Sequence, residues 1–327
     1  MNTTRSSSLD LTRILGMFFV MFIHSSFIED GNRSMVHYCL KSFIASGAVP
    51  VFFLLAGYLS AKNMDSPTLG FSGFIEKKAK TLIIPFLFWN SLALILVFIA
   101  KLTGISSAFQ GNGAYFDVAG TPFSILSALL GLGRQPIVYQ FWFLRDLIVV
   151  SIISFLFRRA VPKIPFLPWM LFLVPIPMAS SMAFYLLGYS MKKITAAELP
   201  KQNSCVLYCL LWIILGVEQF FAHVTIPSPI QQLGSAAFIF MLAHILSYHS
   251  WGTKLSTVGA SVFFIYAAHE PLQTIMAKSW QILGVPGYGS LGCFLLIPAT
   301  SFLICLVGYK GLKKITPKLM PVITGGR

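Results

Sequence analysis

The sequence contains few charged residues, and acidic residues are the scarcest of them. Only 10% of its 327 residues are charged, with 10 Asp or Glu against 24 Lys or Arg. A soluble domain usually carries about 25% charged residues. Hydrophobic residues make up 56% of the chain, and the mean hydropathy is +0.77. This composition excludes a soluble globular protein and indicates a polytopic membrane protein whose length is taken up by membrane spans.

Cysteine is also scarce, and its spacing excludes two kinds of site. The chain has five cysteines, and none of them forms a Cys-x-x-Cys pair or a Cys/His ligand cluster. Cys205 and Cys209 lie four residues apart on an apolar segment, where cysteine behaves as a small apolar residue. We therefore expect no disulfide framework and no metal site.

Long apolar segments recur along the whole chain. Two of them are short, since a span needs about 20 residues, and they form either two spans or one broken hairpin. We expect an all-α polytopic membrane protein with about ten transmembrane helices in a single domain covering 1–327. The ten segments are 10–28, 36–61, 81–101, 141–157, 164–178, 180–191, 204–223, 229–249, 256–277 and 288–310, of which 164–178 and 180–191 are the short ones.

The basic residues collect at the ends of these segments. If the N-terminus lies in the cytosol, most of the 24 Lys and Arg residues fall on the cytosolic side, as the positive-inside rule requires. The excess positive charge then sets the topology and does not indicate nucleic-acid binding. We expect both termini in the cytosol. The long loop 102–140 then lies on the opposite side of the membrane and contains a short interfacial or re-entrant helix. This loop is either a flexible connector or a segment that binds a substrate.

The first apolar segment carries three ionisable side chains. Arg13 and His24 are eleven positions apart, which is about 20° from three full helical turns, so they share one face roughly 16 Å apart along the axis. Asp10 lies three residues before Arg13, within reach of an ion pair. A charge near the middle of a membrane helix costs roughly 2.5–3.5 kcal/mol on insertion scales. The pattern favours a functional stripe over a snorkelling arginine and a histidine paired between helices.

A lysine cluster precedes the third segment. Lys77, Lys78 and Lys80 would suit a phosphorylated ligand at the cytosolic mouth of a span. The same charges would equally satisfy the orientation rule or bind anionic lipid.

Two further stretches place polar groups at span ends. QFWFLRD brings Trp142 and Arg145 beside Asp146, either as an interfacial span end or as part of a substrate site. IYAAHEP places His269 and Glu270 near the end of the ninth segment. These two residues are either an acid/base element or an interfacial imidazole beside a solvated carboxylate.

Together these patterns resemble acyltransferase family 3, a family of integral-membrane O-acyltransferases. Asp10-x-x-Arg13 followed by ten residues and His24 is similar to the family's first-span signature, and VPVFFLLAGYL is similar to its second-span motif. Lys77-x-x-Lys80 occupies the place of a basic Arg-x-x-Arg element, with lysines that lack the bidentate arginine fork. FWFLRDL and IYAAHEPL resemble the Trp-Phe-Leu and Ile-Tyr-x-x-His stretches, in the same order along the chain.

The resemblance implies ten transmembrane helices in a bacterial inner membrane and transfer of an acyl group, usually acetyl. The donor would be cytosolic acyl-CoA, used as acetyl-CoA without a metal. The acceptor would be a hydroxyl of a cell-surface sugar or lipid-linked glycan. On this hypothesis the catalytic residues are His24, Arg13 and His269, with His24 as general base or brief acyl carrier, and the substrate-binding residues are Asp10, Lys77, Lys78, Lys80, Trp142, Arg145 and Glu270.

Two other classes of protein share some of these features. A secondary transporter of a small polar solute also carries midplane charges and broken spans, although we find no paired broken segments in two related halves. A non-catalytic assembly factor would leave Arg13 and His24 replaceable.

Overall fold

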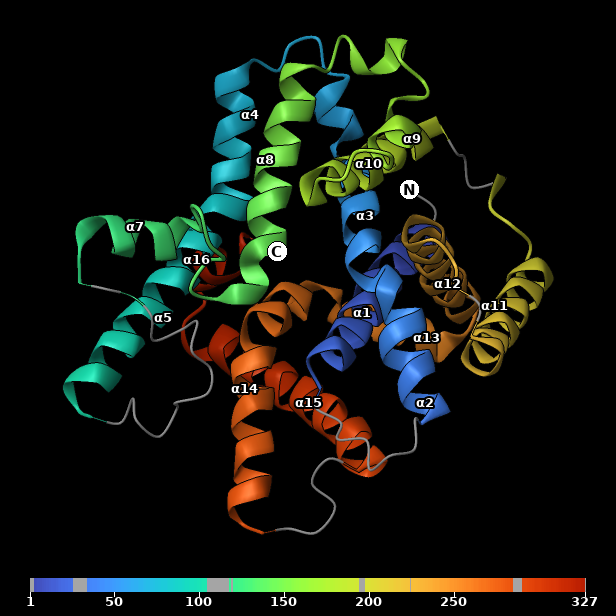
Figure 1. The fold of residues 1–327 in the computed structure, drawn as a ribbon. Helices are drawn as coiled ribbons and strands as arrows, with labels where there is room; N and C mark the ends of the chain where they lie inside the picture. The colour runs from blue at the N-terminus through green and yellow to red at the C-terminus, as the bar shows by residue number, and fades with distance from the viewer. Residues whose placement is uncertain are drawn as a thin grey trace. The chain divides into compact units, whose positions relative to one another are not determined.

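The computed structural model describes residues 3–25, 34–104, 118, 120–193, 198–223, 225–284 and 290–326. Every regular element in this part of the chain is helical, as the sequence predicts (Figure 1). In the predicted loop 102–140, residues 105–117 and 119 lie outside the described part. The chain divides into two compact units, Met1–Asp65 with Arg159–Gly311, and Ser66–Arg158 with Leu312–Arg327.

The first unit holds most of the helices. Its first helix, α1, packs against α3, α12, α13 and α14. The elements are α1 (Thr3–His24), α2 (Met35–His37), the π-helical η1 (Tyr38–Phe43), η2 (Ile44–Gly47), α3 (Ala48–Met64), η6 (Val161–Lys163), α9 (Leu167–Leu171), α10 (Pro177–Ser190), η7 (Met191–Lys193), α11 (Gln202–Ala222), α12 (Ser228–Ser247), α13 (Ser250–Ser256), η9 (Thr257–Ser261), α14 (Val262–Ile282) and α15 (Leu291–Ile315).

The second unit is smaller, and its longest helix, α5, packs against α7 and α16. Asn90 of α5 is fully buried, and its side-chain oxygen accepts a hydrogen bond of 3.1 Å from the backbone N–H of Val138. The elements are α4 (Phe71–Lys78), the π-helical η3 (Ala79–Ile83), α5 (Ile84–Leu102), α7 (Pro122–Leu130), η5 (Tyr139–Phe141), α8 (Trp142–Leu156) and α16 (Met320–Thr324), together with the end of α15.

Seven helical stretches in the described residues are long and apolar enough to cross a membrane. Helix α14 has 21 residues, yet it carries His269, Glu270 and Gln273 and is not among the seven. The seven stretches are Ser7–His24, Met35–Met64, Phe71–Leu102, Tyr139–Leu156, Gln202–Ala222, Ser228–Ser247 and Leu291–Ile315. The protein is therefore an integral membrane protein, while the count of ten spans and the cytosolic termini stay predictions.

The predicted segment 164–178 does not form one long helix. The five-residue α9 ends at Leu171, and α10, which begins at Pro177, has 14 residues. Proline has no backbone N–H to donate, and the four prolines between residues 165 and 177 interrupt the helical ladder. Neither α9 nor α10 is long enough to span a bilayer on its own.

Helices α3 and α10 cross at two glycines. A Cβ built on Gly57 would lie 1.8 Å from the Tyr185 carbonyl oxygen, and one built on Gly188 would lie 1.9 Å from that of Leu54. Backbones this close tolerate only glycine, which is how small residues promote packing between membrane helices. Gly57 and Gly188 therefore allow the close packing of α3 against α10.

Polar contacts also join α3 and α10 at Asp65, the residue that follows α3. The Asp65 carboxylate accepts hydrogen bonds of 2.7 Å from both the Lys192 ammonium and the Tyr189 hydroxyl. Partial burial tends to raise the pKa of Asp65, but these hydrogen bonds outweigh it and hold the pKa below its usual value.

Replacing Gly57 with alanine should destabilise the protein. The added methyl group meets a backbone carbonyl that cannot move away, and overpacking of this kind typically costs about 1–3 kcal/mol. Thermal unfolding of the purified protein in detergent measures the loss. Gly311→Ala is the matched control, because a Cβ there meets no atom within 4 Å. An equal unfolding temperature for the two variants would contradict the tight crossing.

Candidate functional site

The last turn of α1 is held by the side chain of Gln273 from α14. In a regular helix the Met21 carbonyl would accept from the N–H of Ser25, but that N–H bonds to the Phe22 carbonyl instead, at 3.2 Å. The Gln273 side-chain N–H₂ takes its place and donates to Met21 at 3.3 Å. One of the carbonyls left over at a helix C-terminus is thereby satisfied, three residues before His24.

Two further segments hold the residue that follows His24. The Lys41 ammonium, on the π-helical η1, donates to the Ser25 carbonyl at 2.9 Å. The Ser25 hydroxyl donates to the carbonyl of Phe294 on α15 at 3.1 Å. Three different helical segments thus fix the end of α1, and with it the backbone that carries His24.

His24 and His269 lie next to each other at this end of α1. Their ring centroids are 5.3 Å apart with an interplanar angle of 61°. His269 is fully buried, and its Nδ1 lies 2.8 Å from the Tyr266 carbonyl and 3.2 Å from that of Ile265. Carbonyls only accept, so Nδ1 carries the proton and Nε2 has the lone pair. His269 is therefore held in one tautomer, with an unprotonated Nε2.

The helix that carries His269 continues through Pro271 with one backbone hydrogen bond fewer. Proline has no N–H to donate to the Ala267 carbonyl, so the helical ladder loses one bond here. The neighbouring Glu270 is buried, and its side chain accepts a hydrogen bond of 3.1 Å from the Thr274 hydroxyl. The predicted pair of His269 and Glu270 thus lies within the fold and not at a solvated interface.

The ion pair predicted at the start of α1 is present. Arg13 NH1 lies 2.6 Å from Asp10 Oδ1, and both side chains are about one-third exposed. The carboxylate packs against η9, where a Cβ on Gly259 would lie 3.0 Å from the Asp10 Cβ. Element η9 leads directly into α14, so one continuous segment passes Asp10 near one end of α1 and His24 at the other.

A buried histidine to which the sequence assigned no role braces α1 against α12. The Ser8 hydroxyl lies 3.2 Å from Nδ1 of His244 and donates to Ser247 at 2.9 Å. The Tyr248 hydroxyl lies 3.3 Å from the other ring nitrogen of His244. Both hydrogen-bonding positions of this imidazole are occupied, which makes it a structural brace.

The lysine cluster lies in the second unit. Lys80 Nζ is 2.6 Å from Glu76 Oε1, an exposed ion pair one turn apart. Lys78 Nζ lies 5.3 Å from the centroid of the Phe74 ring. Lys77 and Lys80 are exposed on α4 and the π-helical η3.

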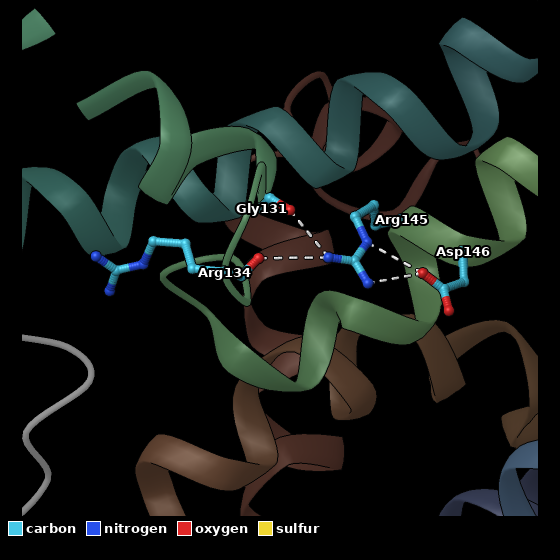
Figure 2. A network of polar contacts seen from close by, with 4 residues as sticks. All are labelled: Gly131, Arg134, Arg145 and Asp146. Atoms are coloured by element: carbon cyan, nitrogen blue, oxygen red, sulfur yellow. Dashed lines mark hydrogen bonds and ion pairs between the residues drawn. The ribbon is translucent and has the colours of Figure 1, made fainter. Parts of the chain in front are cut away.

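Arg145, also in the second unit, holds a turn in place. Its Nε and NH2 donate to Asp146 Oδ1 at 3.0 and 2.9 Å, and its NH1 donates to the carbonyls of Gly131 at 3.0 Å and Arg134 at 3.4 Å (Figure 2). Asp146 is almost fully buried, with 4% of its side chain exposed. This network joins α8 to the turn after α7, whereas Trp142, at the start of α8, contacts the ring of Phe143.

The structure therefore sorts the predicted site residues into two groups. Asp10, Arg13, His24, His269 and Glu270 belong to the first unit, and Lys77, Lys78, Lys80, Trp142 and Arg145 to the second. Within the first group, Asp10 and Arg13 pair along α1, and His24 of α1 contacts His269 of α14. The continuous segment η9–α14 packs against α1 near both pairs.

Comparison with known proteins identifies the class. The family model described as "Acyltransferase domain" matches residues 6–310, so the chain belongs to this family of acyltransferases, as the sequence patterns indicate. The chain is also 22% identical to the succinoglycan biosynthesis protein ExoH of Rhizobium meliloti (strain 1021), over 363 residues that cover 100% of this chain and 94% of that protein. No solved structure matches the chain significantly.

Replacing Arg145 with lysine should loosen the turn after α7. A lysine cannot reproduce the planar fork that joins Asp146 to two carbonyls, and hydrogen bonds to charged groups contribute about 1.5–3 kcal/mol each. We expect a lower unfolding temperature in detergent and faster proteolysis between Gly131 and Pro136.

Arg134→Gln is the matched control for this variant. It also removes one positive charge, but it keeps the backbone carbonyl that Arg145 uses, and the Arg134 side chain points away from Arg145 (Figure 2). Equal stability and equal proteolysis of the two variants would show that the network does not hold the turn.

Proposed function

We propose that this acyltransferase moves an acetyl group from cytosolic acetyl-CoA to a hydroxyl of a cell-surface sugar or lipid-linked glycan. The family supports acyl transfer, and the name of the relative ExoH, a succinoglycan biosynthesis protein, supports a polysaccharide acceptor. The single observation that carries the site is the contact between His24 and His269 at the fixed end of α1.

The reaction needs a base at the point where the hydroxyl attacks. The thioester C–S bond breaks and an ester C–O bond forms, while the hydroxyl proton passes to the base and the CoA thiolate leaves to take up a proton. In our proposal His24 is this base, or carries the acyl group briefly, and His269 assists from the facing helix through its Nε2 lone pair.

Arg13 has a different task in this scheme. Its guanidinium, held by Asp10 at 2.6 Å, orients the donor or stabilises the negative charge that develops during transfer. Lysine ammoniums bind phosphate as point charges, and the cluster of Lys77, Lys78 and Lys80 would attract the phosphates of CoA. Within this cluster, the Lys80 ammonium also pairs with the Glu76 carboxylate at 2.6 Å.

The remaining predicted residues complete the proposed substrate site. Trp142, Arg145 and Glu270 would contact the substrates, although the observed contacts of Arg145 already give it a structural task. The loop 102–140 would face the acceptor on the non-cytosolic side of a bacterial inner membrane. Ten spans with both termini in the cytosol complete this proposal.

Replacing His24 or His269 with alanine should reduce transfer without unfolding the protein. General-base catalysis typically contributes about 10²–10⁴-fold, and we expect a loss in that range for His24→Ala. The measurement is release of free CoA thiol from acetyl-CoA by the purified protein in proteoliposomes, with alkali-deacylated surface glycan as acceptor and detection of the new ester.

The control for these variants is His249→Ala, which removes an exposed imidazole of the same unit. Absence of thiol release by the unaltered protein would refute acyl-CoA-dependent transfer and favour a transporter, which leaves CoA untouched. Full activity of the His24→Ala variant would remove His24 from the site while leaving the reaction class intact.

A further inference from the structure

Helix α14 presents two buried polar atoms that have no hydrogen-bond partner in the described structure. They are Nε2 of His269 and Oε1 of Gln273. The two residues are 0% and 3% exposed. They lie four positions apart on the same face of the helix, about 6 Å along its axis. Buried polar atoms are nearly always paired in native proteins, so two orphans on one face call for an explanation.

The chemistry of both atoms is fixed by their neighbours. The carbonyls of Ile265 and Tyr266 hold the proton on Nδ1 of His269, which leaves Nε2 as an acceptor. The carbonyl of Met21 accepts from the side-chain N–H₂ of Gln273, which assigns the other amide atom as oxygen. Both orphan atoms are therefore hydrogen-bond acceptors, and both need an N–H or O–H group.

The position of the two acceptors relates them to the proposed reaction. Gln273 contacts α1 at Met21, one turn before His24, and His269 contacts the His24 ring itself. Leaving a buried acceptor unsatisfied costs about 1–3 kcal/mol. A substrate that brings donors of its own would remove this cost on binding.

We infer that His269 Nε2 and Gln273 Oε1 together accept hydrogen bonds from a substrate, which makes Gln273 a substrate-binding residue. The inference rests on the proposed function, and it deepens it by naming the recognition chemistry. Both substrates of that reaction carry such donors. The pantetheine arm of acetyl-CoA has amide N–H groups, and the acceptor sugar has hydroxyls.

The test compares three variants of the full-length protein in proteoliposomes. Gln273→Met removes the whole side-chain amide at similar volume, and Gln273→Asn moves the amide, with its acceptor oxygen, back by one methylene. Gln281→Met is the matched control, because Gln281 lies exposed on the same helix. The KM values for acetyl-CoA and for alkali-deacylated glycan are measured separately by thiol release.

We expect Gln273→Met and Gln273→Asn to raise one KM about three- to tenfold, which corresponds to the loss of one neutral hydrogen bond. Gln281→Met should stay near the unaltered value. A higher KM for acetyl-CoA assigns the donor to the pantetheine amide, and a higher KM for the glycan assigns it to a sugar hydroxyl. If Gln273→Met fails to fold, the asparagine variant decides.

Unchanged KM values in both active variants overturn the inference. A lower kcat alone would show that Gln273 only ties α14 to Met21. Absence of thiol release by the unaltered protein would overturn the proposed function, and this inference with it. That result is distinguishable, because it precedes any comparison of variants.

Discussion

The contact between His24 and His269 depends on how the last turn of α1 is held. A helix end leaves carbonyls unpaired, and in a membrane helix these cannot turn to water. Here Gln273 satisfies Met21 and Lys41 satisfies Ser25, so the groups that complete the helix also fix its position. The imidazole of His24 is thereby held against α14, where His269 presents its unprotonated nitrogen.

Helix α1 organises the first unit because its polar side chains meet different neighbours. Ser8 contacts His244 of α12, Asp10 packs against Gly259 of η9, and His24 contacts α14. Polar groups within membrane spans are costly, and pairing them across helices offsets that cost and fixes the register of the helices. Through the contacts of Asp10 and His24, η9 and α14 form one continuous segment that packs along α1.

Much of this arrangement could be predicted from local patterns. Periodicity placed Arg13 and His24 on one face of a helix, and the spacing of Asp10 predicted its ion pair with Arg13. Contacts between residues distant in sequence could not be predicted, because no local pattern says which helices become neighbours. Gln273 was missed for that reason, although a glutamine one turn after a histidine in an apolar helix was a signal that could have found it.

The most direct test of the account is a double-mutant cycle on kcat for His24→Ala and His269→Ala. Catalytic groups that act as a unit are strongly non-additive, because removing either one already disables the pair. The account predicts that the doubly substituted protein is hardly slower than the slower single variant. Losses that multiply in the double variant, or a His269→Ala variant with full activity, would contradict the claim that the two imidazoles work together.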